Sequence, residues 1–120
     1  MLVKSLDHYN VITPRLAETL SFYGEVLEMR VGPTPSNDPR SAWLYDGGER
    51  PILHVQSIDP SAPEVKLKAV RDRLGELIGD LSLADLEGAG AIEHVALECS
   101  DYERTLERMR ANGNAVRTND

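Results

Sequence analysis

Leu6-Asp7-His8-Tyr9-Asn10-Val11 has a second copy later in the chain, Ile92-Glu93-His94-Val95-Ala96-Leu97. The two stretches align under one constant shift of 86 residues, which is the separation of His8 and His94. Each copy combines a short strand pattern, which carries an acidic residue and a histidine near its start, with a polar turn and then a helical pattern. Because an internal repeat fixes architecture, the sequence predicts two copies of one module.

The first module has the pattern of one helix among four strands. Alternation along the first strand places His8 and Asn10 on one face and Asp7 on the other. Thr13 is the expected cap of the helix, and Pro14 suits its first turn. Strands are expected at 4–12, 29–32, 41–45 and 51–58, the last two joined by a hairpin at 46–48 whose glycines can take positive φ. The predicted order is βαβββ.

The rest of the chain is a connector and the beginning of the second module. The connector, about 64–87, is predicted to be mostly helical, with an apolar stripe from Leu67 to Leu81. The second module starts near residue 91 and reaches only its helix and the start of another strand at 115–117. We therefore expect an α+β fold and one domain over 1–120 with its first module at about 4–58. Either the sequence is a fragment of a longer chain, which we favour, or a partner supplies the missing half.

Composition excludes several classes of protein. The 120 residues carry 13 basic and 20 acidic side chains, a net charge of −7, which argues against a nucleic acid or an anionic membrane as the main partner. No apolar run approaches the ~20 residues that span a bilayer, and no signal peptide precedes the first strand. A single cysteine, Cys99, allows no intramolecular disulfide and is expected to be buried and inert. We expect a cytoplasmic protein.

The three histidines are the strongest indication of function. His8 and His94 are equivalent positions of the repeat, and His54 lies in the last strand of the first module on the face of Gln56. If the two modules pair, these imidazoles converge, and imidazole is a ligand for iron, manganese, nickel and zinc. Each histidine taken alone is more simply a packed side chain with a hydrogen bond. The repeat favours the metal-binding interpretation.

A catalytic centre of this type also needs a carboxylate. Glu93 is expected on the opposite face of its strand from His94. Glu98 shares the face but stands four residues away, about 13 Å at ~3.3 Å per residue, too far to bind the same ion. The repeat places the equivalent of His54 at position 140, and the missing carboxylate is expected there.

These residues resemble the vicinal oxygen chelate superfamily, which includes glyoxalase I, fosfomycin- and bleomycin-resistance proteins and extradiol dioxygenases. The resemblance rests on Leu6-Asp7-His8, on Phe22-Tyr23 followed by Leu27, and on the 92–97 stretch. It implies paired βαβββ modules in a U-shaped mixed sheet, with helices on the outer face, around a divalent metal. The sequence departs from the family at Glu28, where glycine is frequent, and in the absent C-terminal glutamate.

The resemblance also implies a set of site residues. The metal ligands fall on His8 and His94, with His54 at the place of a fourth, variable ligand. Candidates for the substrate-binding lining are Asn10, Trp43, Tyr45, Gln56 and Glu98, although packing on a strand face explains each of them as simply. The expected partner is a small molecule that chelates the ion through neighbouring oxygens, and the expected assembly is a homodimer.

Three functions remain open. The first is a metal-dependent dioxygenase or a glyoxalase-like lyase or isomerase, with iron, manganese, nickel or zinc. The second is a metal-free protein that sequesters a small molecule, as bleomycin-resistance proteins do. The third is a dimeric structural module that uses the Leu67–Leu81 stripe as its interface. The three histidines favour the first, because a sequestering pocket does not need them.

Overall fold

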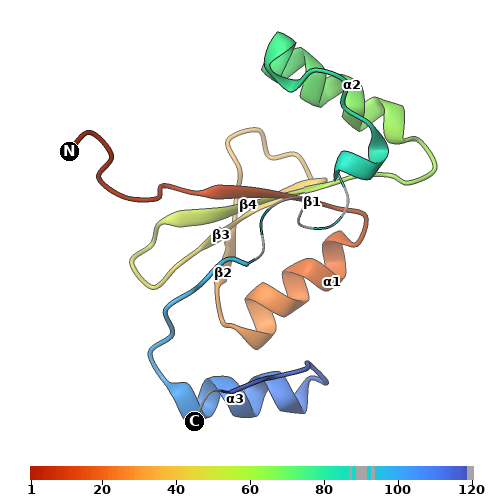
Figure 1. Cartoon of the computed structure of the whole chain (residues 1–120). Helices are drawn as coiled ribbons and strands as arrows, with labels where there is room; N and C mark the ends of the chain where they lie inside the picture. Colours follow the sequence, from red (N-terminus) through yellow and green to blue (C-terminus); the bar gives the residue numbers. More distant parts are fainter. Residues whose placement is uncertain (87, 89–91, 93, 119–120) are drawn as a thin grey trace.

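A four-stranded mixed sheet forms the centre of the computed structural model, which describes residues 1–86, 88, 92 and 94–118. Its strands lie in the order β1-β4-β3-β2, and β1 runs parallel to β4 while the other neighbours are antiparallel. Figure 1 shows α1 on one side of this sheet. The bounds are β1 Tyr9–Thr13, α1 Leu16–Leu20, the π-helical turn η1 Ser21–Val26, β2 Arg30–Gly32, β3 Ser41–Tyr45 and β4 Pro51–Ser57. This βαβββ order and the α+β class are as predicted.

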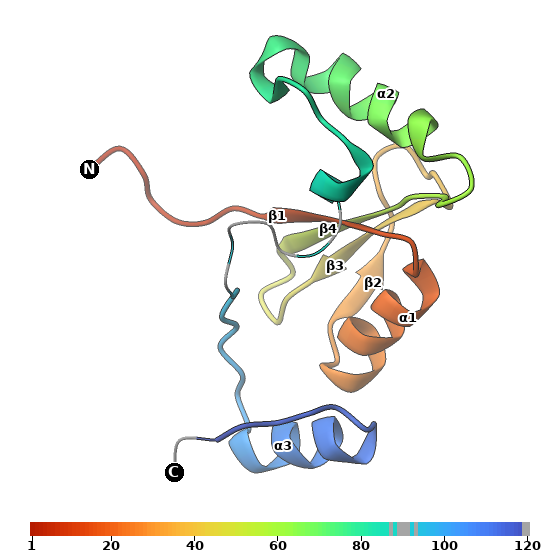
Figure 2. The same cartoon turned by 45° about the vertical axis from the view of Figure 1, so that its right-hand side comes forward.

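In the part of the chain that the structure describes, four helical segments follow the sheet. They are α2 Pro63–Leu74, the 3-10 turns η2 Gly75–Ile78 and η3 Leu83–Leu86, and α3 Tyr102–Ala111. Figure 2 shows α2 on the opposite side of the sheet from α1, with α3 beyond the end of α1. None of the helices in the described ranges is long and apolar enough to cross a membrane.

The hydrophobic core lies between the sheet and α1. Leu44, Leu53 and Val55 are fully buried, and Leu16 and Leu20 of α1 pack on them. In β3 and β4 these buried residues alternate with half-buried ones, the period of two expected for a sheet that is covered on one face. The alternating positions form a second, open face, and this face carries the candidate site.

The first strand begins later than predicted, at Tyr9 instead of residue 4. Its one neighbour is β4, which starts at Pro51, and proline has no N–H to donate to a ladder. In the β1–β4 register residues 4–6 lie beyond the start of β4 and have no strand to pair with, and residues 7 and 8 lie opposite its first two residues, where Pro51 has no N–H to donate. Residues 4–8 are therefore not held to strict alternation, and the prediction that Asp7 points away from His8 is wrong.

Two local predictions need correction. The hairpin after β3 is present, but Glu49, and not Gly47 or Gly48, takes the positive φ of 60°. Thr13 accepts a hydrogen bond from the N–H of Arg15 at 3.0 Å, yet the helix cap is Arg15, since α1 begins at Leu16. In each turn a side-chain oxygen accepts backbone N–H groups, Oδ1 of Asp46 in the hairpin and Oγ1 of Thr13 before the helix. The sequence pattern alone does not show which residue of the turn these bonds fix in its conformation.

The connector is helical as predicted, but its apolar stripe is not a packed face. Gly75 and Gly79 have φ of 60° and 56°, conformations that end a helix, and they divide the segment into short pieces. Of the predicted stripe Val70 is buried, Leu74 and Leu77 are exposed, and the other three residues, Leu67, Ile78 and Leu81, are half-buried.

Among the described residues, the second module is represented by its helix alone. α3 ends at Ala111, close to the predicted end, and Asp101 caps it by accepting from the N–H of Arg104 at 3.0 Å. Positions 92 and 94–99, and positions 115–117, form no strand, contrary to prediction. In the first module β1 depends on its ladder with β4, and the described part of the second copy offers no such neighbour. Cys99 is consequently exposed and not buried.

Candidate functional site

Strand register places two candidate residues beside His54. Trp43 of β3 and Asn10 of β1 are both register partners of His54 in β4. The residues that flank His54 in its strand, Leu53 and Val55, point into the core. His54 therefore projects from the open face with Trp43 on the neighbouring strand.

The rings of His8, His54 and Trp43 form a stack. The centroids of His54 and Trp43 lie 4.1 Å apart with an interplanar angle of 7°, and those of His8 and His54 lie 4.0 Å apart at 15°. His54 is thus held between an indole and a second imidazole. The sequence led us to expect the imidazoles to converge through pairing of the two modules, whereas His8 and His54 meet here within the first module.

The environment of His54 keeps its ring neutral. Burial lowers the pKa of His54, the nearby His8 lowers it further, and hydrogen bonding to the backbone of Pro51 partly opposes the shift. Its Nε2 atom is buried and has no hydrogen-bond partner. A neutral imidazole with an unpaired ring nitrogen is the form that binds a metal ion.

His8 is oriented by its neighbour in sequence. Its Nδ1 donates a hydrogen bond of 2.6 Å to Oδ2 of Asp7, and this bond is the main reason that the pKa of Asp7 is lowered. Nε2 of His8 is then the nitrogen left for a ligand. Carboxylates fix metal-binding histidines in this way, and sequence analysis missed the role of Asp7 because it assumed an alternating strand. The adjacency of Asp7 and His8 in the sequence was the signal that could have indicated this hydrogen bond.

The donors present fit part of a metal centre. His8 and His54 lie together with the right chemistry, but their rings are parallel, so their in-plane lone pairs do not converge on one point. Among the residues that the structure describes, no three His, Cys, Asp or Glu side chains form a group that could hold an ion. His94 therefore does not complete a set with the other two histidines in this arrangement.

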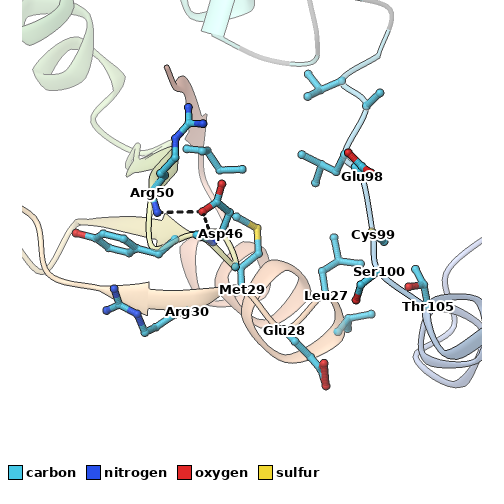
Figure 3. Close-up of a pocket in the computed structure, with 18 of the residues that line it drawn as sticks. Leu27, Glu28, Met29, Arg30, Asp46, Arg50, Glu98, Cys99, Ser100 and Thr105 are labelled. Carbon is cyan, nitrogen blue, oxygen red and sulfur yellow. Dashed lines mark hydrogen bonds between the residues drawn. The ribbon is translucent and has the colours of Figure 1, made fainter. Parts of the chain in front are cut away.

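Two predicted site residues line a different hollow. Tyr45 and Glu98 border a cavity of about 960 Å³ between the end of the sheet and the segment that leads into α3. Figure 3 shows Glu98, Cys99 and Ser100 facing the turn that begins β2 across this space. The lining does not include His8, His54 or Trp43.

Several charged groups around this cavity have structural partners. Asp46 accepts from the N–H of Gly48 and of Arg50, each at 2.9 Å, which closes the hairpin (Figure 3). Glu28 forms a two-pronged ion pair with Arg104 of α3. The Asp46 bonds fix the hairpin on one side of the cavity, and the ion pair of Glu28 connects the turn before β2 to α3.

Gln56 and Asn10 complete the set of predicted residues. Oε1 of Gln56 accepts from Nζ of Lys66 in α2, at the border of a smaller cavity of about 530 Å³. Burial lowers the pKa of Lys66. Asn10 is exposed on the edge strand beside the stack. Only Asn10 and Trp43 of the five predicted lining residues are register neighbours of a histidine.

The fold is an α+β module of βαβββ order with an open mixed sheet, and comparison identifies the family. Residues 5–119 match the Glyoxalase/Bleomycin resistance protein/Dioxygenase superfamily, which is the vicinal oxygen chelate superfamily, and the chain belongs to it. This superfamily includes enzymes such as glyoxalases and dioxygenases as well as proteins that are not enzymes, and a divalent metal is common in it. No curated protein and no solved structure matches the chain.

Proposed function

We propose that the protein is a metal-dependent enzyme of this superfamily, a dioxygenase or a glyoxalase-like lyase or isomerase. His8, His54 and His94 are the proposed ligands of one iron, manganese, nickel or zinc ion. The observation that carries the proposal is Nε2 of His54, which is buried without a hydrogen-bond partner next to His8, whose Nδ1 is held by Asp7.

The chain's own groups have separate roles in this proposal. A bound ion would stabilise negative charge that develops on a substrate with two neighbouring oxygens. Asn10 offers amide groups beside the histidines and would orient the substrate by hydrogen bonds. Trp43 and Gln56 would border the same face, while Tyr45 and Glu98 would contact a substrate that reaches the larger cavity.

Metal-free sequestration of a small molecule is the second candidate. The parallel stack of His8 and His54 favours it, because stacked rings present a flat surface and not converging lone pairs. The protein would then bind a planar ligand, and the histidines would line its pocket.

Metal stoichiometry distinguishes the two functions. We expect mass spectrometry of the purified chain, after incubation with each of the four metals and removal of the excess, to find about one ion per chain. Replacing His8, His54 or His94 by alanine should abolish tight binding, because each change removes one donor. Glu64→Gln, an exposed carboxylate of α2, is the matched control and should bind as the wild type does.

A chain that binds none of the four metals would overturn the enzyme proposal and support sequestration. Equal metal content in the wild type and all three alanine variants would show that the ion lies elsewhere. A homodimer and a cytoplasmic location belong to the same proposal, since dimers are common in the superfamily. Sedimentation of the full chain measures the first of these directly.

A further inference from the structure

The smaller cavity, of about 530 Å³, lies between α2, the end of β4 and the loop that leads into β3. Figure 2 shows the first turn of α2 at this end of the sheet. Gln56 and Ser41 border the cavity and are register partners in β4 and β3, so the backbone ladder fixes this wall. Because strand side chains alternate, Gln56 shares the open face with His54, two residues before it. The cavity therefore borders the face that carries the candidate site.

Lys66 of α2 brings a positive charge into this cavity. Its side chain is half-buried, and its Nζ donates to Oε1 of Gln56, a neutral amide. An ammonium group has three N–H donors, and no carboxylate among the described residues forms an ion pair with Lys66. Burial of a charge without a counter-charge is unfavourable, and it lowers the pKa of Lys66. Two N–H donors of Lys66 are therefore available to a ligand.

The charged groups around Lys66 favour an anion in the cavity. Arg40 and Arg73 lower the pKa of Lys66 further, whereas Asp38 raises it. Both carboxylate oxygens of Asp38 already accept from the guanidinium of Arg40, at 3.0 Å each. Asp59, at the rim of the cavity, accepts two hydrogen bonds from the loop that follows it, at 2.9 and 2.6 Å. The acids beside the cavity are thus engaged elsewhere, and the charge of Lys66 is not neutralised.

We propose that this cavity binds the oxyanion of a small ligand, a phosphate or a carboxylate group, with Lys66 as its counter-charge. The free N–H donors of Lys66 would bind the oxyanion directly. Arg40 offers a further donor at the rim, because its hydrogen bonds to Asp38 use Nε and Nη2 and leave Nη1. The site uses none of the three histidines, so it is independent of the proposed metal centre.

Titration with inorganic phosphate tests the site. We expect saturable changes in the amide signals of the full chain by nuclear magnetic resonance, confined to the first turn of α2, the end of β4 and the loop before β3. Lys66→Gln should bind phosphate about tenfold more weakly, because it loses a charge-assisted hydrogen bond. Lys68→Gln is the matched control. It removes the same charge from the same helix, but Lys68 is exposed and pairs with Asp72 at 2.6 Å, so this variant should bind as the wild type does.

Equal phosphate affinity in the Lys66 and Lys68 variants would overturn the proposal, as would signal changes that do not saturate. Lys66→Arg separates charge from packing, since it keeps the positive charge and the bond to Gln56 is open to it. This variant should bind phosphate within about threefold of the wild type. Binding as weak as that of Lys66→Gln would show that the charge at this position does not hold the anion.

The titration of Lys66 itself supplies a second readout. Burial lowers its pKa below the ordinary lysine value, and a bound anion should raise it, because a negative charge stabilises the protonated amine. Carbon-13 shifts of its Cε atom, followed against pH with and without phosphate, measure this change. An unchanged pKa of Lys66 at saturating phosphate would overturn the direct contact.

Acetate in place of phosphate distinguishes the two oxyanions. A phosphate site should bind phosphate about tenfold more tightly than acetate, because phosphate carries more charge and more acceptor oxygens. Acetate that binds as tightly as phosphate, and is lost in Lys66→Gln, would assign the site to a carboxylate. A wild type that binds neither anion would overturn the proposal, whatever the metal experiment shows.

Discussion

Glu28 combines an unfavourable backbone conformation with a favourable ion pair. Its φ is 61°, in the left-handed region, where a side chain costs about 1–2 kcal/mol relative to glycine. The same side chain forms the ion pair with Arg104 that connects the end of η1 to α3. The positive φ explains why glycine is frequent at this position in the family. This chain has Glu28 there instead, and its side chain makes the charged contact to α3.

Substitutions at Glu28 separate the two effects. Glu28→Ala loses the ion pair and keeps the strained backbone, whereas Glu28→Gly loses the pair but relieves the strain. We therefore expect the glycine variant to be more stable than the alanine variant by about 1 kcal/mol in urea denaturation. Glu49, with φ of 60°, provides a matched pair of variants that should differ by a similar amount. An alanine variant as stable as the glycine variant would contradict the backbone argument.

The contact between β2 and β3 depends on the absence of a side chain at Gly32. A Cβ atom there would lie 2.5 Å from Cε2 of Tyr45. The Tyr45 ring cannot easily move, because its hydroxyl donates to the carbonyl of Pro33 at 3.3 Å and the guanidinium of Arg30 lies 4.2 Å from the ring centroid. Gly32 therefore lets the ring lie flat over the edge strand.

Replacing Gly32 by alanine should force this ring out of place. We expect a loss of about 1–3 kcal/mol in the free energy of unfolding, the range for overpacking. Gly47→Ala is the control, since a Cβ there meets no atom within 4 Å, and its stability should change little. Urea denaturation monitored by circular dichroism compares the two variants. Equal stability of both would show that Tyr45 is free to move.

Elements whose partners are close in sequence could be predicted, and those that depend on distant partners could not. β3 and β4 were predicted almost to the residue because a short hairpin joins them and their alternation is regular. β1 was extended too far, because its end is set by Pro51, more than forty residues away. The candidate site shows the same division. The sequence led us to expect His8 and His54 to converge through pairing of the two modules, but their contact within the first module, together with Trp43, required the register of β4 with β1 and β3.

At the scale of the whole molecule, two arginines attach α3 to the first module. Arg108 of α3 donates from Nε to the carbonyl of Val26 at 2.7 Å, and its Nη2 donates to the carbonyl of Glu25. These carbonyls belong to the last turn of η1, where unpaired acceptors and the negative end of the helix dipole favour a cation. Arg104 adds the ion pair to Glu28 nearby. The repeat predicted α3 itself, but not where it would attach.

This attachment makes α3 a separately opening unit that depends on Arg108. We expect Arg108→Ala to increase hydrogen exchange about fivefold in the amides of Tyr102–Ala111, equivalent to about 1 kcal/mol for a half-exposed charged hydrogen bond. The amides of β3 and β4 should keep their protection, because the core between the sheet and α1 does not include α3. Arg110→Ala, which removes an exposed arginine from the same helix, controls for helix propensity and should exchange more slowly than Arg108→Ala. If the two variants exchanged alike, the carbonyl contacts of Arg108 would not be what holds the helix, and the ion pair of Arg104 would have to be sufficient.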